Sequence, residues 1–287
     1  MWFILVLVDE PQIGRTRHTA SEYGLLNGPS FDFRLDRAEV SPDLAGHVER
    51  HWMTSWNLPG GQRRPVTLLP HPCVNLVYEG GALIAFGVGR ELFTYACEGT
   101  GRAFGVKFRP GGFQPYLGRP MTELTDGGIP LSALWGEIDA GLFAHDLSRA
   151  RRLDDLVEAA EFHLRRHPPR PDPQIDHVGE IIQVMLHDRT VQRVEDVAER
   201  FSLSPRSLQR LFGKYVGVTP KWVLQRYRLH EAAARLAAEH TRPWAEVAVE
   251  LGYFDQSHFI RDFTRAVGMT PAAYSEACAQ DRAPIST

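Results

Sequence analysis

Residues 194–223 read VEDVAERFSLSPRSLQRLFGKYVGVTPKWV, and residues 244–274 repeat the pattern as WAEVAVELGYFDQSHFIRDFTRAVGMTPAAY. One extra residue enters the turn of the second copy, after which the two copies match at eight of thirteen positions. In the first copy these positions are Leu208, Arg210, Phe212, Lys214, Val216, Gly217, Thr219 and Pro220. A repeat of this kind, with apolar residues at helical spacing, predicts two copies of one helical unit.

Each copy has the pattern of a helix-turn-helix unit. A short helix is predicted over residues 195–201 in the first copy and over 245–251 in the second. After a turn, an N-cap residue starts the next helix: Ser204 with Pro205 behind it, and Asp255 in the second copy. Ser and Asp side chains accept hydrogen bonds from the free N–H groups at a helix start, and proline suits the first helical position.

The second helix of each unit is predicted to bury its apolar residues and to expose its polar ones. The inward-facing residues are Leu208, Leu211, Phe212 and Tyr215 in the first copy and Phe259, Phe263, Ala266 and Val267 in the second. The outward-facing residues are Arg206, Gln209, Arg210 and Gly213, and in the second copy Ser257, Arg261, Thr264 and Arg265. Arginine pairs with guanine and glutamine with adenine in the major groove. The outward faces therefore predict two recognition helices.

Local charge supports this interpretation. The whole chain has a net charge of −3, which by itself argues against nucleic acid. Residues 204–228, however, hold six basic residues and no acidic one. Such a stretch is usually a solvated helix face, but within a helix-turn-helix repeat it favours DNA.

Over residues 172–278 the sequence resembles the AraC/XylS family of bacterial transcription regulators. The specific parts are ELGYFDQSHFIRDFTRAVGMTPAAY and LSPRSLQRLFGKYVGVTPKWV, with RYRLHEAAARLAAE between them. The resemblance implies that one chain places two recognition helices in successive major grooves on one face of double-stranded DNA.

The resemblance also implies which side chains contact DNA. In the first helix they are Arg206, Gln209 and Arg210, as contacts to base edges or phosphates. In the second helix they are Gln256, Ser257 and Arg261, with His258 nearby. Helical spacing places Lys214 about one turn beyond Arg210, toward the phosphate backbone, and Arg265 matches it in the second copy.

The N-terminal half is predicted to be mostly β. Strand-like segments at 74–78, 83–88, 92–97 and 103–108 alternate with glycine-rich turns, and residues 98–101 are predicted to form a hairpin turn. The stretch GVKFRPGG, followed by FQPYLG and GIPLSALWG, is similar to the β-rich sensing domains that precede such DNA-binding units. The resemblance implies a cupin-like barrel or sandwich that binds a small effector or mediates dimerisation. The expected fold class is α+β, with an all-α C-terminal domain that holds the two helix-turn-helix motifs.

Residues 167–173, HPPRPDP, contain four prolines and are predicted to be an extended linker. They separate a β-rich sensing or dimerisation domain, residues 1–166, from a DNA-binding domain, residues 174–280. Just before the linker, residues 153–164 form an amphipathic helix pattern. Its apolar face either packs on its own β domain or pairs with a second copy of the chain.

Other features limit the alternatives. The three cysteines are scattered, which predicts that the protein works in a reducing compartment, the cytoplasm. The apolar run Trp2–Val8 is too short to span a membrane and fits a buried strand. No catalytic motif, cofactor fingerprint or regular metal-ligand spacing is present. His71 and Cys73, with His51, either serve a structural role or supply metal ligands. A set of aromatic residues forms either the core or the mouth of a ligand-binding barrel: Trp52, Trp56, Phe86, Phe93, Tyr95, Phe104 and Phe108.

The leading hypothesis is a sequence-specific DNA-binding transcription regulator that is not an enzyme, needs no cofactor or metal, and has no membrane partner. Its expected partners are double-stranded DNA, a small effector in the N-terminal domain, a second copy of itself, and RNA polymerase if it is an activator. The alternatives are an enzyme or a protein-interaction domain fused to the DNA-targeting module.

Overall fold

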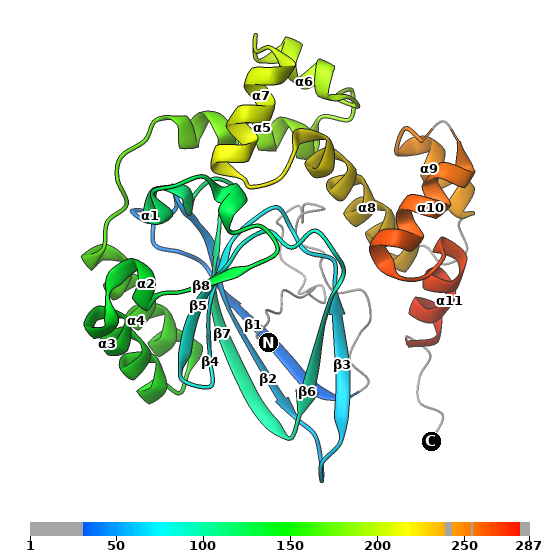
Figure 1. The fold of residues 1–287 in the computed structure, drawn as a ribbon. Coiled ribbons are helices and arrows are strands. Elements are labelled where there is room, and N and C mark those ends of the chain that lie inside the picture. Colours follow the sequence, from blue (N-terminus) through cyan, green and yellow to red (C-terminus); the bar gives the residue numbers. More distant parts are fainter. Residues whose placement is uncertain (1–30, 239–242, 254, 282–287) are drawn as a thin grey trace.

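The computed structural model describes residues 31–238, 243–253 and 255–281, and it shows a β-rich N-terminal part followed by a helical C-terminal part (Figure 1). The α+β fold class expected from the sequence is confirmed. The strand expected at Trp2–Val8 lies outside the described residues, as does Phe254 in the turn of the second repeat. Within the described part of the chain, no helix is both long enough and apolar enough to span a bilayer.

The N-terminal part contains two antiparallel sheets. The larger sheet has six strands, which are in spatial order β1 (Asp32–Ala38), β2 (Val48–Asn57), β7 (Thr100–Phe108), β4 (Asn75–Glu79), β5 (Ala82–Phe86) and β8 (Gly128–Pro130). The smaller one pairs β3 (Arg63–Leu68) with β6 (Phe93–Glu98). A buried apolar cluster contains residues from both sheets, so the two sheets enclose a shared core.

Two tryptophans fix the packing of this shared core. In the antiparallel ladder of β2 and β7, Trp52 lies opposite Gly105 and Trp56 lies opposite Gly101. A Cβ atom on Gly105 or on Gly101 would lie only 2.2 Å from the indole ring of its partner. Each indole therefore lies against bare backbone, and both rings are buried.

The strands predicted at 74–78, 83–88, 92–97 and 103–108 are confirmed, as β4, β5, β6 and β7. The predicted hairpin at 98–101 is wrong, because β6 pairs with β3 whereas β7 pairs with β2 and β4. The chain leaves one sheet and enters the other at Gly99, whose φ of +56° a glycine adopts without strain.

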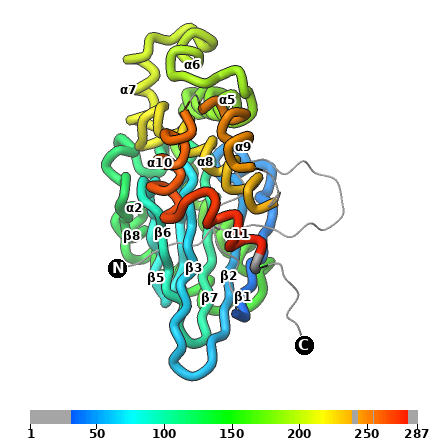
Figure 2. Tube along the Cα trace, turned by 90° about the vertical axis from the view of Figure 1, so that its right-hand side faces the viewer, coloured from blue at the N-terminus to red at the C-terminus, as the bar shows by residue number. Residues whose placement is uncertain are grey.

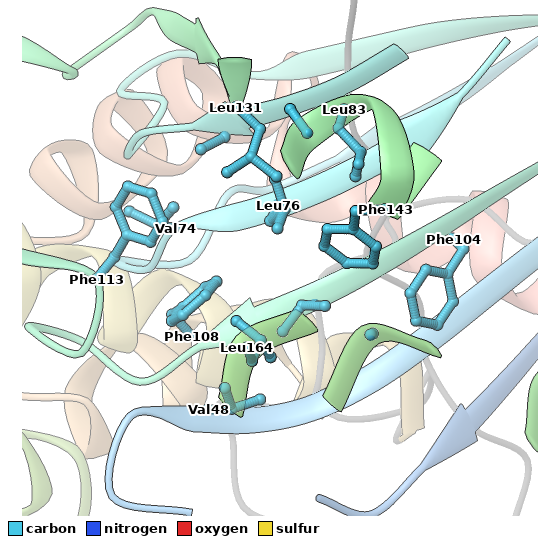
Figure 3. Close-up of a cluster of buried hydrophobic side chains, with 14 of the residues drawn as sticks. Val48, Val74, Leu76, Leu83, Phe104, Phe108, Phe113, Leu131, Phe143 and Leu164 are labelled. Carbon is cyan, nitrogen blue, oxygen red and sulfur yellow. The ribbon is translucent and has the colours of Figure 1, made fainter. Parts of the chain in front are cut away.

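Helices cover the other face of the large sheet. The longest are α3 (Glu137–Arg149) and α4 (Leu153–Arg166), which follow the short helices α1 (Gln114–Leu117), η2 (Met121–Glu123) and α2 (Ser132–Trp135). Figure 3 shows Phe143 of α3 between Leu76 and Phe104 of the sheet, and Leu164 of α4 near Phe108 and Val48.

The apolar face of α4 packs on its own β domain. Leu156, Ala160 and Leu164 are buried in the same cluster as the sheet residues. Of the two alternatives for this face, packing on its own β domain is confirmed.

The C-terminal part is helical in all of its described elements, as predicted. Its elements are α5 (Gln174–His187), α6 (Val194–Arg200), α7 (Pro205–Tyr215), α8 (Pro220–Ala238), α9 (Trp244–Glu250), α10 (Gln256–Val267) and α11 (Pro271–Asp281). The 19-residue helix α8 joins two apolar clusters, one around α5–α7 and one around α9–α11 (Figure 1). At about 1.5 Å per residue, α8 is about 28 Å long.

The β domain packs against α8 through a pair of histidines and a buried arginine. The rings of His71 and His230 stack with centroids 4.0 Å apart. The guanidinium of Arg226 is buried and donates a hydrogen bond of 2.6 Å to the Arg90 carbonyl oxygen. The buried side chain of Leu69 also belongs to the apolar cluster of α8–α11. The two halves of the chain therefore share an apolar and hydrogen-bonded interface.

The β domain also contacts both helix-turn-helix units at the same position of the repeat. Thr125 Oγ1 donates a 2.6 Å hydrogen bond to the Gly217 carbonyl oxygen, just after α7. Gly268 is the equivalent residue after α10, and a Cβ atom on it would lie 3.2 Å from Leu92 Cδ2. Both glycines have a positive φ, 93° and 82°, a backbone conformation that favours glycine.

We expect the protein to lose stability as the pH falls below about 6.5. Burial, together with the nearby positive charges and His230, holds the pKa of His71 well below its ordinary value, and burial lowers the pKa of His51. Near pH 6, the unfolded chain therefore binds protons that the folded protein does not, so the free energy of unfolding decreases as the pH falls. Denaturant titrations at pH 7.5 and 5.5 would measure this loss.

The variant His71→Phe keeps a ring against His230 and removes one titrating group, so it should show a smaller loss between these two pH values. An equal loss in the variant and in the original protein would show that His71 does not contribute to it.

Candidate DNA interface

Helix α7 begins as the sequence predicts. The Ser204 hydroxyl accepts a 3.0 Å hydrogen bond from the Ser207 backbone N–H, and Pro205 occupies the first position of the helix. The inward face consists of Leu208, Phe212 and Tyr215, which are buried, and Leu211, which is half-buried. This apolar stripe fixes which side of α7 faces solvent.

The exposed face of α7 carries Arg206, Gln209 and Arg210. Among the described residues, no carboxylate forms an ion pair with the guanidinium groups of Arg206 or Arg210. These donors are therefore available for a ligand, and a guanidinium can donate two parallel hydrogen bonds to one guanine.

Helix α10 has the same construction. The Asp255 carboxylate accepts a 2.8 Å hydrogen bond from the Ser257 backbone N–H, as an N-cap. Phe259, Phe263 and Val267 are buried. Thr264, predicted to point outward, is instead half-buried, with its hydroxyl oxygen shielded from solvent. It lies at the border of the apolar stripe, and at such a position helical spacing alone does not predict whether a side chain is buried or exposed.

The positive charge of α10 is reduced by a buried acidic residue of the same helix. Asp262 is buried and accepts a 2.6 Å hydrogen bond from Gln225 Nε2 of α8. His258 Nε2 lies 3.1 Å from the same carboxylate, and Arg265 Nη1 lies 3.8 Å from it. The Arg261 Nε donates to the Ser257 carbonyl oxygen of its own helix. Gln225 is a residue that the sequence analysis missed, since its partner lies 37 positions away.

Gln256, Ser257, His258, Arg261 and Arg265 are all exposed on α10. In Figure 2, α7 and α10 both lie to the left of their partner helices α6 and α9. Two units in the same orientation, joined by one continuous helix, are suited to successive grooves on one face of DNA.

Lys214 already has partners within the protein. Its ammonium donates a 2.8 Å hydrogen bond to Tyr215 Oη, which in turn donates to the Asp172 carboxylate at 2.6 Å. These contacts raise the pKa of Lys214 and lower that of Asp172. Gly213, which was predicted to face outward, is only half-exposed. It lies near the β domain: a Cβ atom on it would be 3.7 Å from Thr122 Cγ2.

Two regions of the chain match known families. Residues 197–277 match the family described as a helix-turn-helix domain. Residues 37–130 match a domain of unknown function, DUF6597. The C-terminal region is an AraC-type helix-turn-helix domain.

About a third of this chain is similar to named bacterial regulators. The chain is 35% identical over 103 residues to the RCS-specific HTH-type transcriptional activator RclR of Escherichia coli, which covers 34% of this chain and 35% of that protein. It is 35% identical over 100 residues to the HTH-type transcriptional activator RhaS of Salmonella arizonae, covering 33% of this chain and 36% of that protein. The chain therefore spans about a third of the length of these curated relatives.

A solved structure similar to this chain is the crystal structure of ToxT from Vibrio cholerae. It is 9% identical to this chain, with a TM-score of 0.38, and the alignment covers 87% of this chain and 98% of that chain. In the present structure the β-rich N-terminal part and the AraC-type domain follow each other in the order that the sequence resemblance implied.

The three residues considered as metal ligands are not brought together. His51 Nε2 lies 3.3 Å from the Glu161 carboxylate, whereas His71 stacks on His230. Burial raises the pKa of the Cys73 thiol to about 11. No group of three or more metal-binding side chains occurs among residues 31–238, 243–253 and 255–281.

A cavity of about 510 Å³ lies beside the contact between the β domain and the AraC-type domain. Its walls come from the segments 68–75, 86–93 and 126–128. Phe86 and Phe93, two members of the aromatic set, line it, whereas Trp52, Trp56, Phe104 and Phe108 are buried in the core. The core interpretation is thus confirmed for these four residues, Tyr95 packs against the same core, and ligand binding by Phe86 and Phe93 stays a prediction.

Proposed function

We propose that this protein is a sequence-specific DNA-binding transcription regulator. In this proposal, residues 174–280 read the DNA, residues 167–173 act as the linker, and residues 1–166 regulate binding. The observation that carries the proposal is the pair of recognition helices, α7 and α10, which expose polar and basic side chains at equivalent positions. The relatives named as transcriptional activators support it.

Within the two helices we assign base reading to exposed residues on the side away from the buried stripe, and to Gln256 at the start of α10, which is exposed but is assigned from the family resemblance alone. These are Arg206, Gln209 and Arg210 on α7, and Gln256, Ser257 and Arg261 on α10. Residues at the sides of the helices are assigned to the phosphate backbone; they are Lys214, His258 and Arg265. The buried carboxylate of Asp262 makes the second helix less cationic, so we assign the larger share of the affinity to α7.

A footprint of the full chain on the DNA upstream of its own gene and of neighbouring genes tests this proposal. We expect two protected major-groove segments about one helical turn, roughly 10 base pairs, apart. A folded protein that protects no segment in these regions, and that selects no motif from a random DNA library, would rule out sequence-specific binding.

We expect Lys214→Ala to lower the affinity for all DNA sequences about equally. A lysine that contacts a phosphate releases one counterion on binding, so its loss should reduce the salt slope of log K by roughly one unit. Binding to the selected motif and to a scrambled duplex, each measured over a series of salt concentrations, gives both quantities.

In this protein Lys214 must leave its partners Tyr215 and Asp172 to reach a phosphate. The variant Asp172→Asn provides the matched control, because it weakens the hold on Lys214 and should leave the salt slope unreduced. If Lys214→Ala changed neither the affinity nor the salt slope, the lysine would be a purely structural contact.

We further propose that the β domain responds to a small effector and that the protein acts in the cytoplasm, where the chromosome is accessible. For self-association, the exposed apolar side chains of Ile138, Leu142 and Phe162 on α3 and α4 are the candidates. RNA polymerase is a partner if the protein activates transcription, as the names of its relatives indicate for those proteins. Sedimentation of the protein with and without Leu142→Glu tests the self-association.

A further inference from the structure

The cavity of about 510 Å³ contains one buried polar side chain that has no hydrogen-bond partner. His71 is 5% exposed, and neither of its ring nitrogens has a hydrogen-bond partner among the described residues. Buried ring nitrogens without a partner lose their hydrogen bonds to water and gain none from the protein, which lowers the free energy of unfolding. A ligand that supplied the missing partner would recover this loss.

Two other polar side chains in the walls, Asn75 and Asp126, already have partners. Asn75 accepts a 3.1 Å hydrogen bond from Trp52 Nε1, and its amide lies 3.7 Å from Cys73 Sγ. Asp126 accepts hydrogen bonds from the backbone N–H and from the Nε of Arg90, at 2.7 and 2.6 Å. Of the two buried polar side chains in these walls, His71 is therefore the one left to orient a ligand, and Glu91 is exposed.

The charges in the walls disfavour an anion. None of the described residues that line the cavity is a lysine or an arginine; Asp126 is paired with Arg90, and Glu91 adds a second carboxylate. Lys107 and Arg50 line a neighbouring cavity on which His71 also borders, and both are paired with Glu49. The burial of the ring and these positive charges keep His71 neutral, so it offers one N–H donor and one acceptor nitrogen.

The remaining lining is apolar. Leu68, Leu69 and Leu92 face the cavity together with the rings of Phe86 and Phe93. The volume lies within the range of small-molecule sites, which are typically apolar with a few polar groups that fix the orientation.

We infer that this cavity binds a neutral, mostly apolar molecule, of the size of a small aromatic compound, with one hydroxyl or carbonyl group that hydrogen-bonds to His71. The inference rests on the proposed function, since it names the chemical class of the effector.

The position of the cavity gives this ligand a route to the DNA-binding domain. The His71 ring stacks on His230 of α8, and the Arg90 carbonyl oxygen, in the loop that lines the cavity, accepts the hydrogen bond of Arg226. Leu92 of the same loop approaches Gly268 after α10. A ligand that moves this loop or the His71 ring therefore shifts contacts made by α8 and α10.

Three probes of similar shape separate the ligand classes. They are 1-naphthol, which is neutral with one hydroxyl; naphthalene, which lacks it; and 1-naphthoate, which is an anion. With the full-length protein in isothermal titration calorimetry, we expect 1-naphthol to bind about 2–10-fold more tightly than naphthalene, the usual effect of one neutral hydrogen bond. We expect 1-naphthoate to bind more weakly than either.

The variant His71→Phe keeps a ring against His230 and removes the hydrogen bond. It should bind 1-naphthol and naphthalene equally, while the matched control His47→Phe, outside the cavity, should keep the preference for 1-naphthol. If His71→Phe does not fold, Gly89→Leu leaves the histidine in place. It adds a side chain to the cavity wall beside Pro70 and should weaken both neutral probes.

The assignment is overturned if 1-naphthoate binds most tightly, if 1-naphthol and naphthalene bind equally to the original protein, or if none of the three binds up to its solubility limit. Because calorimetry needs no DNA, the ligand assignment and the proposed DNA-binding function are tested independently. Probe binding without any DNA footprint would contradict the proposed function alone, and a footprint without probe binding would contradict the ligand assignment alone.

Discussion

Arg206→Ala and Arg210→Ala are each expected to remove sequence preference at one base pair of the DNA site. Both guanidinium groups are exposed on the outward face of α7, opposite the buried residues Leu208 and Phe212. The loss of a bidentate contact to guanine costs about 1–3 kcal/mol, or about 5–150-fold in affinity for the preferred sequence. Binding-site selection with each variant, followed by measured affinities for the wild-type motif, gives both results.

A matched control is Arg34→Ala on β1, which removes an exposed arginine paired with Asp36 in the β domain. It should leave both the motif and the affinity unchanged. If the two α7 variants returned the wild-type motif with a uniformly lower affinity, both arginines would be phosphate contacts. Base reading would then fall to Gln209 and to α10.

Phe212→Ala is expected to lower the free energy of unfolding by about 3–5 kcal/mol. The Phe212 ring is completely buried between α7 and the helices around it, so its removal leaves a cavity in the core of the first unit. Phe263 is its equivalent in the second repeat, is equally buried, and should give a loss of the same size. Denaturant unfolding followed by circular dichroism measures both variants.

Phe162→Ala makes the same chemical change at a side chain that is 52% exposed. Its expected effect is about 0.5 kcal/mol or less, as is usual for a surface position. A loss for Phe212→Ala as small as that of Phe162→Ala would mean that the helix-turn-helix core is not packed as described.

The local features of the fold were predictable from the sequence. The caps of α7 and α10 at Ser204 and Asp255 depend on side chains two or three residues from the groups that they bind. The buried stripes of these helices follow from the 3.6-residue period alone. The repeat strengthened both predictions, because each copy supplied an independent test of the same pattern.

The pairing of the β domain was not predictable in the same way. Trp52 and Trp56 rest on Gly105 and Gly101, which come about fifty positions later in the chain and carry no local sign of their partners. The turn at Gly99 looks like a hairpin in sequence, yet it joins two different sheets. Strand partners are set by such long-range contacts, which the alternation of apolar residues does not specify.

The same distinction holds for the candidate DNA interface. Helical spacing placed Arg206, Gln209 and Arg210 on an exposed face, as the structure has them. It could not show that Asp172, 42 positions before Lys214, lies beside that lysine, or that Gln225 holds the buried Asp262. The polar partners of a recognition helix belong to tertiary structure, and they decide which of its charges are free.

The contacts at Gly217 and Gly268 have a consequence for the geometry of the operator. Loops of one β domain approach the same point on each repeat, so α7 and α10 are held by a common body as well as by α8. DNA turns by about 34–36° per base pair, so a single inserted pair would rotate the second groove away from α10. With both helices held in this way, the angular phase between the two half-sites becomes part of what the protein recognises.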